Sequence, residues 1–213
     1  MIIAVSGYPG SGKTSLCKLL SENDNFISFE LGILFRSLLM FCKDNSIDIN
    51  CFSEKKIYNN LNISYLINSE NQMEFIIDGF RFEFDKLFNL KMNMETVKFG
   101  GLIGDDMNKN IEKIIKEIAD EYNLILNVRK PFSVYPELDL HIFLIADFLT
   151  RSKRKAELNN ISLVEAMKKL KERDIMEKNN DFLEVRDNSK IINTTTSDVN
   201  DTYIKVKKLI RRL

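Results

Sequence analysis

The strongest constraint on this chain is the segment Gly7-Tyr8-Pro9-Gly10-Ser11-Gly12-Lys13-Thr14, which places three glycines and one proline within eight residues. A short apolar run, Met1 to Ser6, precedes this segment. Leu16, Leu19 and Leu20 follow it at helical spacing. Apolar runs of this length are typical of strands buried in a parallel sheet. The segment is therefore predicted to be a tight turn that joins a buried strand to the first turn of a helix.

The residue types in this turn suit the binding of phosphate. Gly7-x-x-x-x-Gly12-Lys13-Thr14 has the spacing of a P-loop. Glycines let backbone N–H groups turn toward phosphate oxygens, and the helix that follows points its positive end at the same anion. Lys13 is predicted to reach the β- and γ-phosphates, and the Thr14 hydroxyl to coordinate Mg²⁺. The predicted nucleotide-binding residues are Gly7, Gly10, Ser11, Gly12, Lys13, Thr14 and Ser15.

Strands and helices are predicted to alternate along the rest of the chain. Further strand candidates are Phe26–Phe29, Phe75–Ile77, Leu124–Val128, His141–Ile145 and Lys190–Asn193. Helical candidates cover about 32–42, 111–122, 163–170 and 199–213. This alternation predicts an α/β fold: a three-layer P-loop NTPase core around a parallel sheet. Residues 43–106 are less regular and rich in Asn, so we expect an insertion there, with residues 1–42 and 107–213 forming the core.

The composition limits the partners of such a core. Lys plus Arg and Asp plus Glu both number 31 among the 213 residues, so the formal net charge is +0. A balanced charge argues against nucleic acid or a membrane as partner, although it allows a local cationic pocket. The three cysteines have no metal-ligand spacing. A cytoplasmic protein, monomeric or weakly oligomeric, is the simplest expectation.

The P-loop indicates nucleotide binding but not which reaction follows. Other motifs are needed to distinguish the classes of P-loop protein. A guanine-specific switch protein needs an Asn-Lys-x-Asp base reader, and the nearest match, Asn108 to Ile111, lacks the Asp. Small size and scattered arginines favour a small-molecule kinase. Such enzymes position two anions in line and neutralise their charge with Lys, Arg and Mg²⁺.

Several segments then resemble nucleoside monophosphate kinases, and cytidylate kinases in particular. Glu30-Leu31-Gly32-Ile33-Leu34-Phe35-Arg36 resembles the Asp-Thr-Gly-x-x-Tyr-Arg element of the monophosphate kinases. Leu124 to Arg129, followed by His141 to Leu144, is similar to the strand pair of cytidylate kinases that contains Gly-Arg-Asp. The other matching segments are Arg151 to Lys155, Lys171 to Glu177, and Asn193 to Thr195. The resemblance covers nearly the whole chain, in the family's order.

The resemblance implies a role for each matching residue. Arg36 and Arg129 would grip the acceptor phosphate, because a planar guanidinium pairs with two phosphate oxygens. Arg151, Arg154 and Arg173 would close onto the transferred phosphoryl group from a short lid at about 151–182. Glu30 would hold a Mg²⁺-bound water or orient the acceptor. The implied catalytic residues are Lys13, Arg129, Arg151, Arg154 and Arg173, and the implied substrate-binding residues are Glu30, Arg36, Arg129, Lys130 and Glu177.

Three departures from the family pattern leave the acceptor open. Lys130 stands where the family has Asp, and Asn180 stands where its lid motif ends in Arg. No Arg lies at Gly104 to Asn108, where we expect Asp105 and Asp106 to be charges at a helix N-terminus. The expected reaction is transfer of the γ-phosphoryl group of ATP, with Mg²⁺, to a nucleoside monophosphate such as CMP or dCMP. The alternatives are a kinase of the same fold for a nucleoside-like metabolite or sugar, and a non-catalytic nucleotide-binding module.

One segment resembles a different group of kinases. Phe75-Ile76-Ile77-Asp78-Gly79-Phe80-Arg81 is similar to the Asp-Gly-Phe-Pro-Arg strand end of adenylate kinases, without the Pro. A core strand there would make Arg81 a ligand of the acceptor phosphate. The strand pair at Leu124 and His141 favours the cytidylate pattern, which places Phe75 in the insertion.

Overall fold

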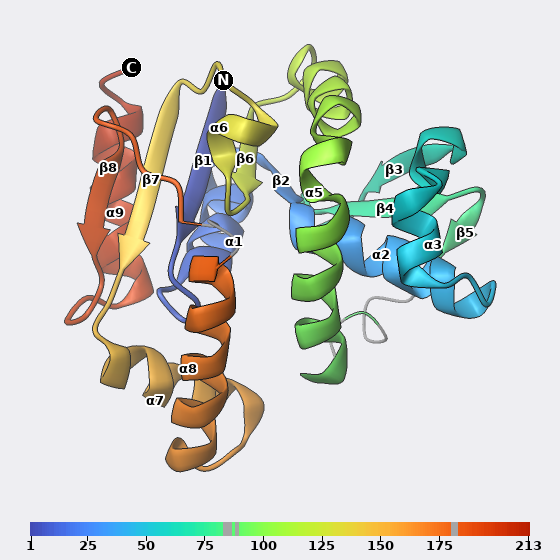
Figure 1. Ribbon diagram of the computed structural model, residues 1–213. Coiled ribbons are helices and arrows are strands. Elements are labelled where there is room, and N and C mark those ends of the chain that lie inside the picture. The colour runs from blue at the N-terminus through green and yellow to red at the C-terminus, as the bar shows by residue number, and fades with distance from the viewer. Residues whose placement is uncertain (83–86, 88–89, 180–182) are drawn as a thin grey trace.

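A five-stranded parallel sheet forms the centre of the molecule. The computed structural model describes residues 1–82, Leu87, 90–179 and 183–213. The strands are β1 (Ile2–Gly7), β2 (Ile27–Glu30), β6 (Leu124–Asn127), β7 (Leu140–Ile145) and β8 (Lys190–Asn193). They lie in the order β2-β6-β1-β7-β8, and every neighbouring pair is parallel. The predicted parallel sheet is confirmed, with β1 and the turn after it in the middle (Figure 1).

Two helical layers cover the sheet because side chains alternate between its faces. Ile2 and Ala4 of β1 belong to one apolar cluster, and Ile3 and Val5 belong to the other. The first cluster includes α2 (Leu31–Asp44) and α5 (Leu90–Ala119), and the second includes α1 (Lys13–Asp24) and α9 (Val199–Ile210). The remaining core helices are α6 (Pro131–Val134), α7 (Phe148–Asn159) and α8 (Leu163–Asn179). The three-layer α/β core is therefore as predicted.

A second, antiparallel sheet lies against α2 and beside edge strand β2 of the parallel sheet (Figure 1). It contains β3 (Ile63–Ile67), β4 (Met73–Ile77) and β5 (Phe80–Arg81), and follows α3 (Ile49–Glu54) and the 3-10 turn η1 (Ile57–Asn60). Phe75 thus lies outside the parallel sheet, as the cytidylate pattern predicts. Arg81 pairs instead with Glu74, at 2.6 Å between Nη2 and Oε2.

Helix α5 differs from the sequence prediction in length. It runs without interruption from Leu90 to Ala119, across the boundary expected at residue 107. Asp105 and Asp106 therefore lie inside a long helix, and their expected place at a helix N-terminus is wrong. Asp106 accepts a hydrogen bond from the Tyr58 hydroxyl at 2.9 Å, and Asp105 lies 3.6 Å from the Lys130 ammonium. Both carboxylates tie α5 to neighbouring segments.

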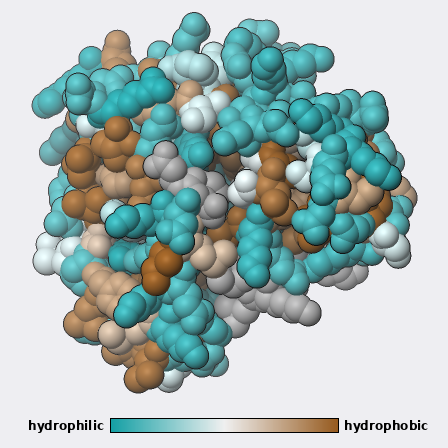
Figure 2. All heavy atoms as spheres, viewed as in Figure 1, coloured by the Kyte–Doolittle hydropathy of each residue, from teal (hydrophilic) through white to brown (hydrophobic). Residues whose placement is uncertain are grey.

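The face of the molecule seen in Figure 2 is mainly hydrophilic, and hydrophobic atoms gather over the sheet edge and the lower helices. Exposed apolar side chains on β8, α7 and α8 include Ile191, Leu149, Leu158 and Val164. Among the described residues, no helix combines the length and the apolar character needed to cross a membrane.

The start of the P-loop depends on a glycine packed against the neighbouring strand. Gly7 has φ +129, and a Cβ added there would lie 2.1 Å from the Leu144 carbonyl oxygen. We expect Gly7→Ala to lower the free energy of unfolding by about 3 kcal/mol or more, measured by urea denaturation. Gly79→Ala is the matched control: it has φ +82, but no described heavy atom lies within 4 Å of its added Cβ. Its cost should be only about 1 kcal/mol, and equal losses in both variants would contradict the packing argument.

Candidate functional site

One large cavity, of about 1060 Å³, lies at the carboxyl ends of the parallel strands. Residues at the end of β2 or after β1, β6 and β8 line it: Glu30, Gly10 to Ser15, Arg129 and Thr194. Because parallel strands all end at the same edge of a sheet, segments distant in sequence meet there. The cavity extends across the sheet in the order of the strands. It runs from Glu30 at the β2 edge, past the central P-loop, to Thr194 at the β8 edge.

The P-loop presents the start of α1 to this cavity. Helix α1 begins at Lys13, after Gly12 with φ +100, so its first-turn N–H groups have no partners within the helix. Lys13 Nζ donates to the carbonyl oxygens of Gly7 and Tyr8, at 2.7 and 2.9 Å. The pKa of Lys13 is lowered to about 7, mainly by burial; Glu177 opposes this effect, and Arg129 and Arg173 add to it. A phosphate in the loop would supply the negative charge that favours protonated Lys13.

Glu177 is fully buried and holds two of the predicted arginines. Its Oε1 atom accepts from Arg129 Nε at 2.9 Å and from Arg173 Nε at 3.0 Å. Burial raises the pKa of Glu177, but Arg129, Arg173 and Lys13 outweigh it and leave that pKa below its usual value. The carboxylate is thus charged, and it aligns the two guanidinium groups that line the cavity.

Glu30 and Arg36 form the side of the cavity nearest to β2. Arg36 is buried, and its Nη1 atom lies 3.9 Å from Glu30 Oε1. Burial raises the pKa of Glu30, and Arg36, Arg129 and Lys13 oppose this effect without cancelling it. The structure therefore brings Glu30, Arg36, Arg129, Arg173 and Lys13 together, as the sequence predicted, with Glu177 beneath them.

Lys155 is a further cation of this site that the sequence analysis did not select. It lines the cavity from α7, and burial followed by Arg173, Arg129 and Arg36 lowers its pKa to about 8. Within the described part of the chain, its ammonium makes no hydrogen bond or ion pair. We call Lys13, Arg36, Arg129, Lys155 and Arg173 the cation cluster. The signal for Lys155 was its position one helical turn after Arg151, on the face that α7 turns toward the P-loop.

Arg151 and Arg154 lie beside the P-loop, but both bind protein groups. Arg151 makes a bidentate pair with Asp174, at 3.0 and 2.8 Å, and donates to the Pro9 carbonyl oxygen at 3.2 Å. Arg154 reaches the cavity wall and donates to the Thr194 carbonyl oxygen at 2.6 Å and to Ser197 O at 3.2 Å. These contacts join α7 to α8, to the P-loop and to the segment after β8. A catalytic role for either arginine stays a prediction.

The structure describes one of the two residues, Lys130 and Asn180, at which the sequence departs from the family pattern. Lys130 points away from the large cavity, toward Asp105, and lines a separate hollow of about 290 Å³ with Ser133 and Glu184. Its substrate-binding role is therefore not supported by this geometry. Asn180 lies outside the described residues.

Thr14 is the P-loop residue for which the sequence predicts a contact with Mg²⁺, and that contact stays a prediction. It lines the cavity, and its hydroxyl oxygen accepts from Asn127 Nδ2 at 3.3 Å. Among the described residues, no group of three or more His, Cys, Asp or Glu side chains could hold a metal. This donor set suits Mg²⁺, which keeps several waters and binds few protein ligands when phosphate oxygens complete its shell.

Comparisons with known proteins agree with this geometry. The sequence model of the cytidylate kinase family matches residues 3–212. Cytidylate kinase of Mesomycoplasma hyopneumoniae (strain 7448) is 27% identical over 225 residues, covering 99% of this chain and 93% of that protein. Cytidylate kinase of Clostridium botulinum is 25% identical over 219 residues, covering 99% and 97%. A solved structure of an uncharacterized protein from Eubacterium ventriosum is similar in fold, with a TM-score of 0.56, 14% identity and coverage of 100% and 99%.

The lowered pKa values predict how stability depends on pH. Lys13 and Lys155 have pKa values of about 7 and about 8 in the fold, whereas the unfolded chain keeps both protonated up to about 10.5. Between about pH 7 and pH 10 the unfolded state therefore binds more protons, so the free energy of unfolding should gain a rising contribution with pH. Lys155→Met should flatten this rise in urea denaturation between pH 7 and 9.5. Lys153→Met, at an exposed position of α7, is the control and should keep the wild-type slope. A wild-type slope in Lys155→Met would contradict the assignment.

Proposed function

Because the chain belongs to the cytidylate kinase family, we propose that it transfers the γ-phosphoryl group of ATP to a nucleoside monophosphate, CMP or dCMP. The family establishes a nucleotide kinase, a phosphotransferase of the P-loop type. The donor, the acceptor and the residue roles that follow are our proposal.

The observation that carries the proposal is that the cation cluster, which includes Lys13 of the P-loop, lines one cavity. Lys13 and the start of α1 suit the phosphates of a donor nucleotide. Arg36 and Arg129, nearer to the β2 edge, suit a second anion. The carboxylates of Glu30 and Glu177 lie among these five cations, and bound phosphate groups would add negative charge to the same place.

The proposed chemistry needs no nucleophile from the protein. An oxygen of the acceptor phosphate attacks the γ-phosphorus while the bond from that phosphorus to the β–γ bridging oxygen breaks, which leaves ADP. Arg36 and Arg129 hold the attacking phosphate. Lys13, Lys155 and Arg173 stabilise the negative charge on the equatorial and leaving oxygens. Glu177 fixes Arg129 and Arg173 in place by its two hydrogen bonds.

ATP and Mg²⁺ are the proposed donor and cofactor. Thr14 would bind the ion, with Asn127 orienting the Thr14 hydroxyl. When bound, Mg²⁺ would neutralise negative charge on the phosphate oxygens of ATP. The division of the chain is proposed in the same way: residues 43–106 serve the acceptor, and 1–42 with 107–213 serve the donor. The second sheet and α5 border the cavity at its β2 edge, where Gln72 and Thr96 line it.

Turnover measured with a panel of candidate acceptors tests which acceptor the protein uses. Purified protein with ATP and Mg²⁺ should form ADP in the presence of CMP or dCMP, with lower kcat/KM for UMP, GMP and AMP. Coupled ADP detection measures the turnover. Turnover on a sugar or a nucleoside-like metabolite alone would replace the monophosphate proposal, and ATP binding without turnover on any acceptor would refute it.

Lys13 and Lys155 are tested by substitution. Lys13→Met should lower kcat by about 10³-fold or more, and Lys155→Met by about 10²-fold, because each removes a charge placed at the transferred group. Lys155→Arg should recover much of the activity, since it keeps the charge. Lys153→Met on the same helix is the control and should match the wild type. Thermal unfolding checks that each variant is folded, and undiminished kcat in folded Lys13→Met would overturn its role.

A further inference from the structure

Arg151 lies buried beside the P-loop, and each nitrogen of its guanidinium group donates to a protein atom. Nε donates to the Ala146 carbonyl oxygen and Nη1 to the Pro9 carbonyl oxygen, both at 3.2 Å. Nη1 and Nη2 also form the bidentate pair with Asp174, at 3.0 and 2.8 Å. The Arg151 side chain is only 7% exposed. Arg151 thus joins three segments: the P-loop, the residue that follows β7, and helix α8.

The P-loop also packs on Arg151 through two of its own residues. The guanidinium carbon of Arg151 lies 5.0 Å from the centre of the Tyr8 ring, which is within the range of a cation–π interaction. Gly10 has φ +78, and a Cβ added there would lie 3.0 Å from the Arg151 carbonyl oxygen and 3.2 Å from its Cβ atom. The P-loop and α7 are therefore in close contact at this point, so a shift of Arg151 would displace the P-loop.

Asp174, the partner of Arg151, stands next to groups of the site on α8. Successive residues of an α-helix point about 100° apart, so Asp174 can face α7 while Arg173, just before it, lines the cavity. Arg173 Nε donates to Glu177 Oε1, one turn further along α8, at 3.0 Å. Because these side chains share one helix, a shift of α8 at Asp174 would also move Arg173 and Glu177.

The same contacts argue against direct contact between Arg151 and the transferred phosphoryl group. Within the described part of α7, Arg154 and Lys155 line the large cavity, and Arg151 does not. To reach a phosphate in the cavity, Arg151 would have to leave Asp174. Separating a buried ion pair in this way is costly, because the carboxylate is left without its partner. Arg151 therefore stays paired while other residues of α7 supply cations to the cavity.

We propose that Arg151 is a positioning residue: together with Asp174 it holds α8 against the P-loop and so places Arg173 for phosphoryl transfer. This inference rests on the proposed function. It replaces the catalytic role that the family resemblance implies for Arg151, because the effect of Arg151 on the reaction passes through Arg173.

The test is a mutant cycle with Arg173. Arg151→Lys and Asp174→Asn are made in the wild-type chain and in Arg173→Met, and kcat is measured with saturating ATP and CMP or dCMP. Each change should lower kcat by about 10-fold or more in the wild-type chain, because a small displacement of a group at the reacting atoms is costly. In Arg173→Met each should alter kcat by less than about 2-fold, since the residue through which they act is absent.

Glu172→Gln is the matched control, because Glu172 is an exposed acid on the same helix. It should keep the kcat of its parent in both backgrounds. Thermal unfolding checks the structural effect: loss of the ion pair should lower the Tm in both backgrounds, whereas the loss of kcat should occur only where Arg173 is present. A loss of kcat by the same factor in both backgrounds, or wild-type kcat in folded Asp174→Asn, would overturn the inference.

Calorimetric titration with ATP gives a readout that does not need turnover. Arg151→Lys and Asp174→Asn should weaken ATP binding in the wild-type chain and leave it unchanged in Arg173→Met. An equal loss of affinity in both backgrounds would contradict a role through Arg173. A wild-type protein that phosphorylates neither CMP nor dCMP would refute the proposed function, and this titration would then decide the inference by the same criterion.

Discussion

An excess of positive charge around one buried carboxylate is the constraint on which the rest of this site depends. Glu177 holds Arg129 and Arg173, and Lys13 and Lys155 lie close enough for the arginines to lower their pKa values. Like charges that share a partly buried site repel each other more strongly than they would in water. Two phosphate groups would remove this repulsion. The fold without ligand therefore carries an electrostatic cost, which bound anions would reduce and which deprotonation of Lys13 and Lys155 reduces as well.

Parallel strands explain why the sequence could predict part of this site. Lys13, Glu30 and Arg129 each come shortly after or at the end of a strand, and parallel strands bring those ends to one edge. Once the apolar runs were identified as strands, the positions of these residues followed from topology. Arg151 and Lys155 lie on a helix, where topology alone does not decide which side chain faces the cavity. The pairing of Arg151 with Asp174 and the orientation of Lys155 depend on how α7 packs, which only the structure shows.

Packing between helices also explains the part of α5 that the sequence did not predict. The sequence analysis described residues 43–106 as irregular and rich in Asn. Gly100, Gly101 and Gly104 in this segment also have low helix propensity. In the structure, a Cβ added at Gly100 would lie 3.1 Å from the Phe35 ring of α2. The glycine thus lets the two helices approach closely. Packing of the Phe35 ring outweighs the low helix propensity of glycine here. A single sequence does not show which aromatic ring will pack against which glycine.

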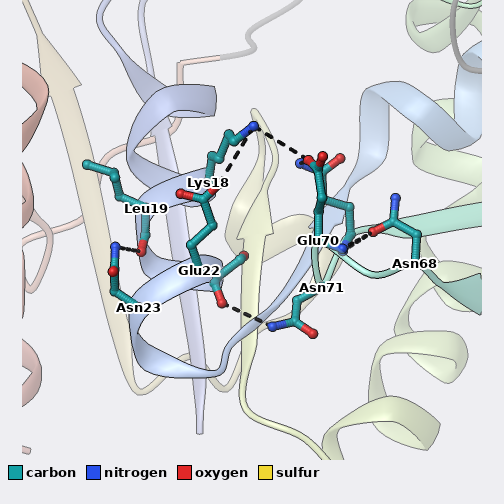
Figure 3. A network of polar contacts seen from close by, with 9 residues as sticks. Lys18, Leu19, Glu22, Asn23, Asn68, Glu70 and Asn71 are labelled. Atoms are coloured by element: carbon teal, nitrogen blue, oxygen red, sulfur yellow. Dashed lines mark hydrogen bonds and ion pairs between the residues drawn. The ribbon is translucent and has the colours of Figure 1, made fainter.

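Helix α1 connects the two halves of the cavity by direct contacts. Its first residues form the P-loop, and one to two turns later Lys18 and Ser21 contact the β3–β4 turn, residues 68–72 (Figure 3). Edge strand β2 holds the same turn through Ser28, and β2 ends at Glu30 on the cavity wall. A displacement of this turn would therefore alter both its contacts with α1 and the wall at the β2 edge. One helix thus contacts both the proposed donor region, through the P-loop, and the β3–β4 turn at the β2 edge of the cavity.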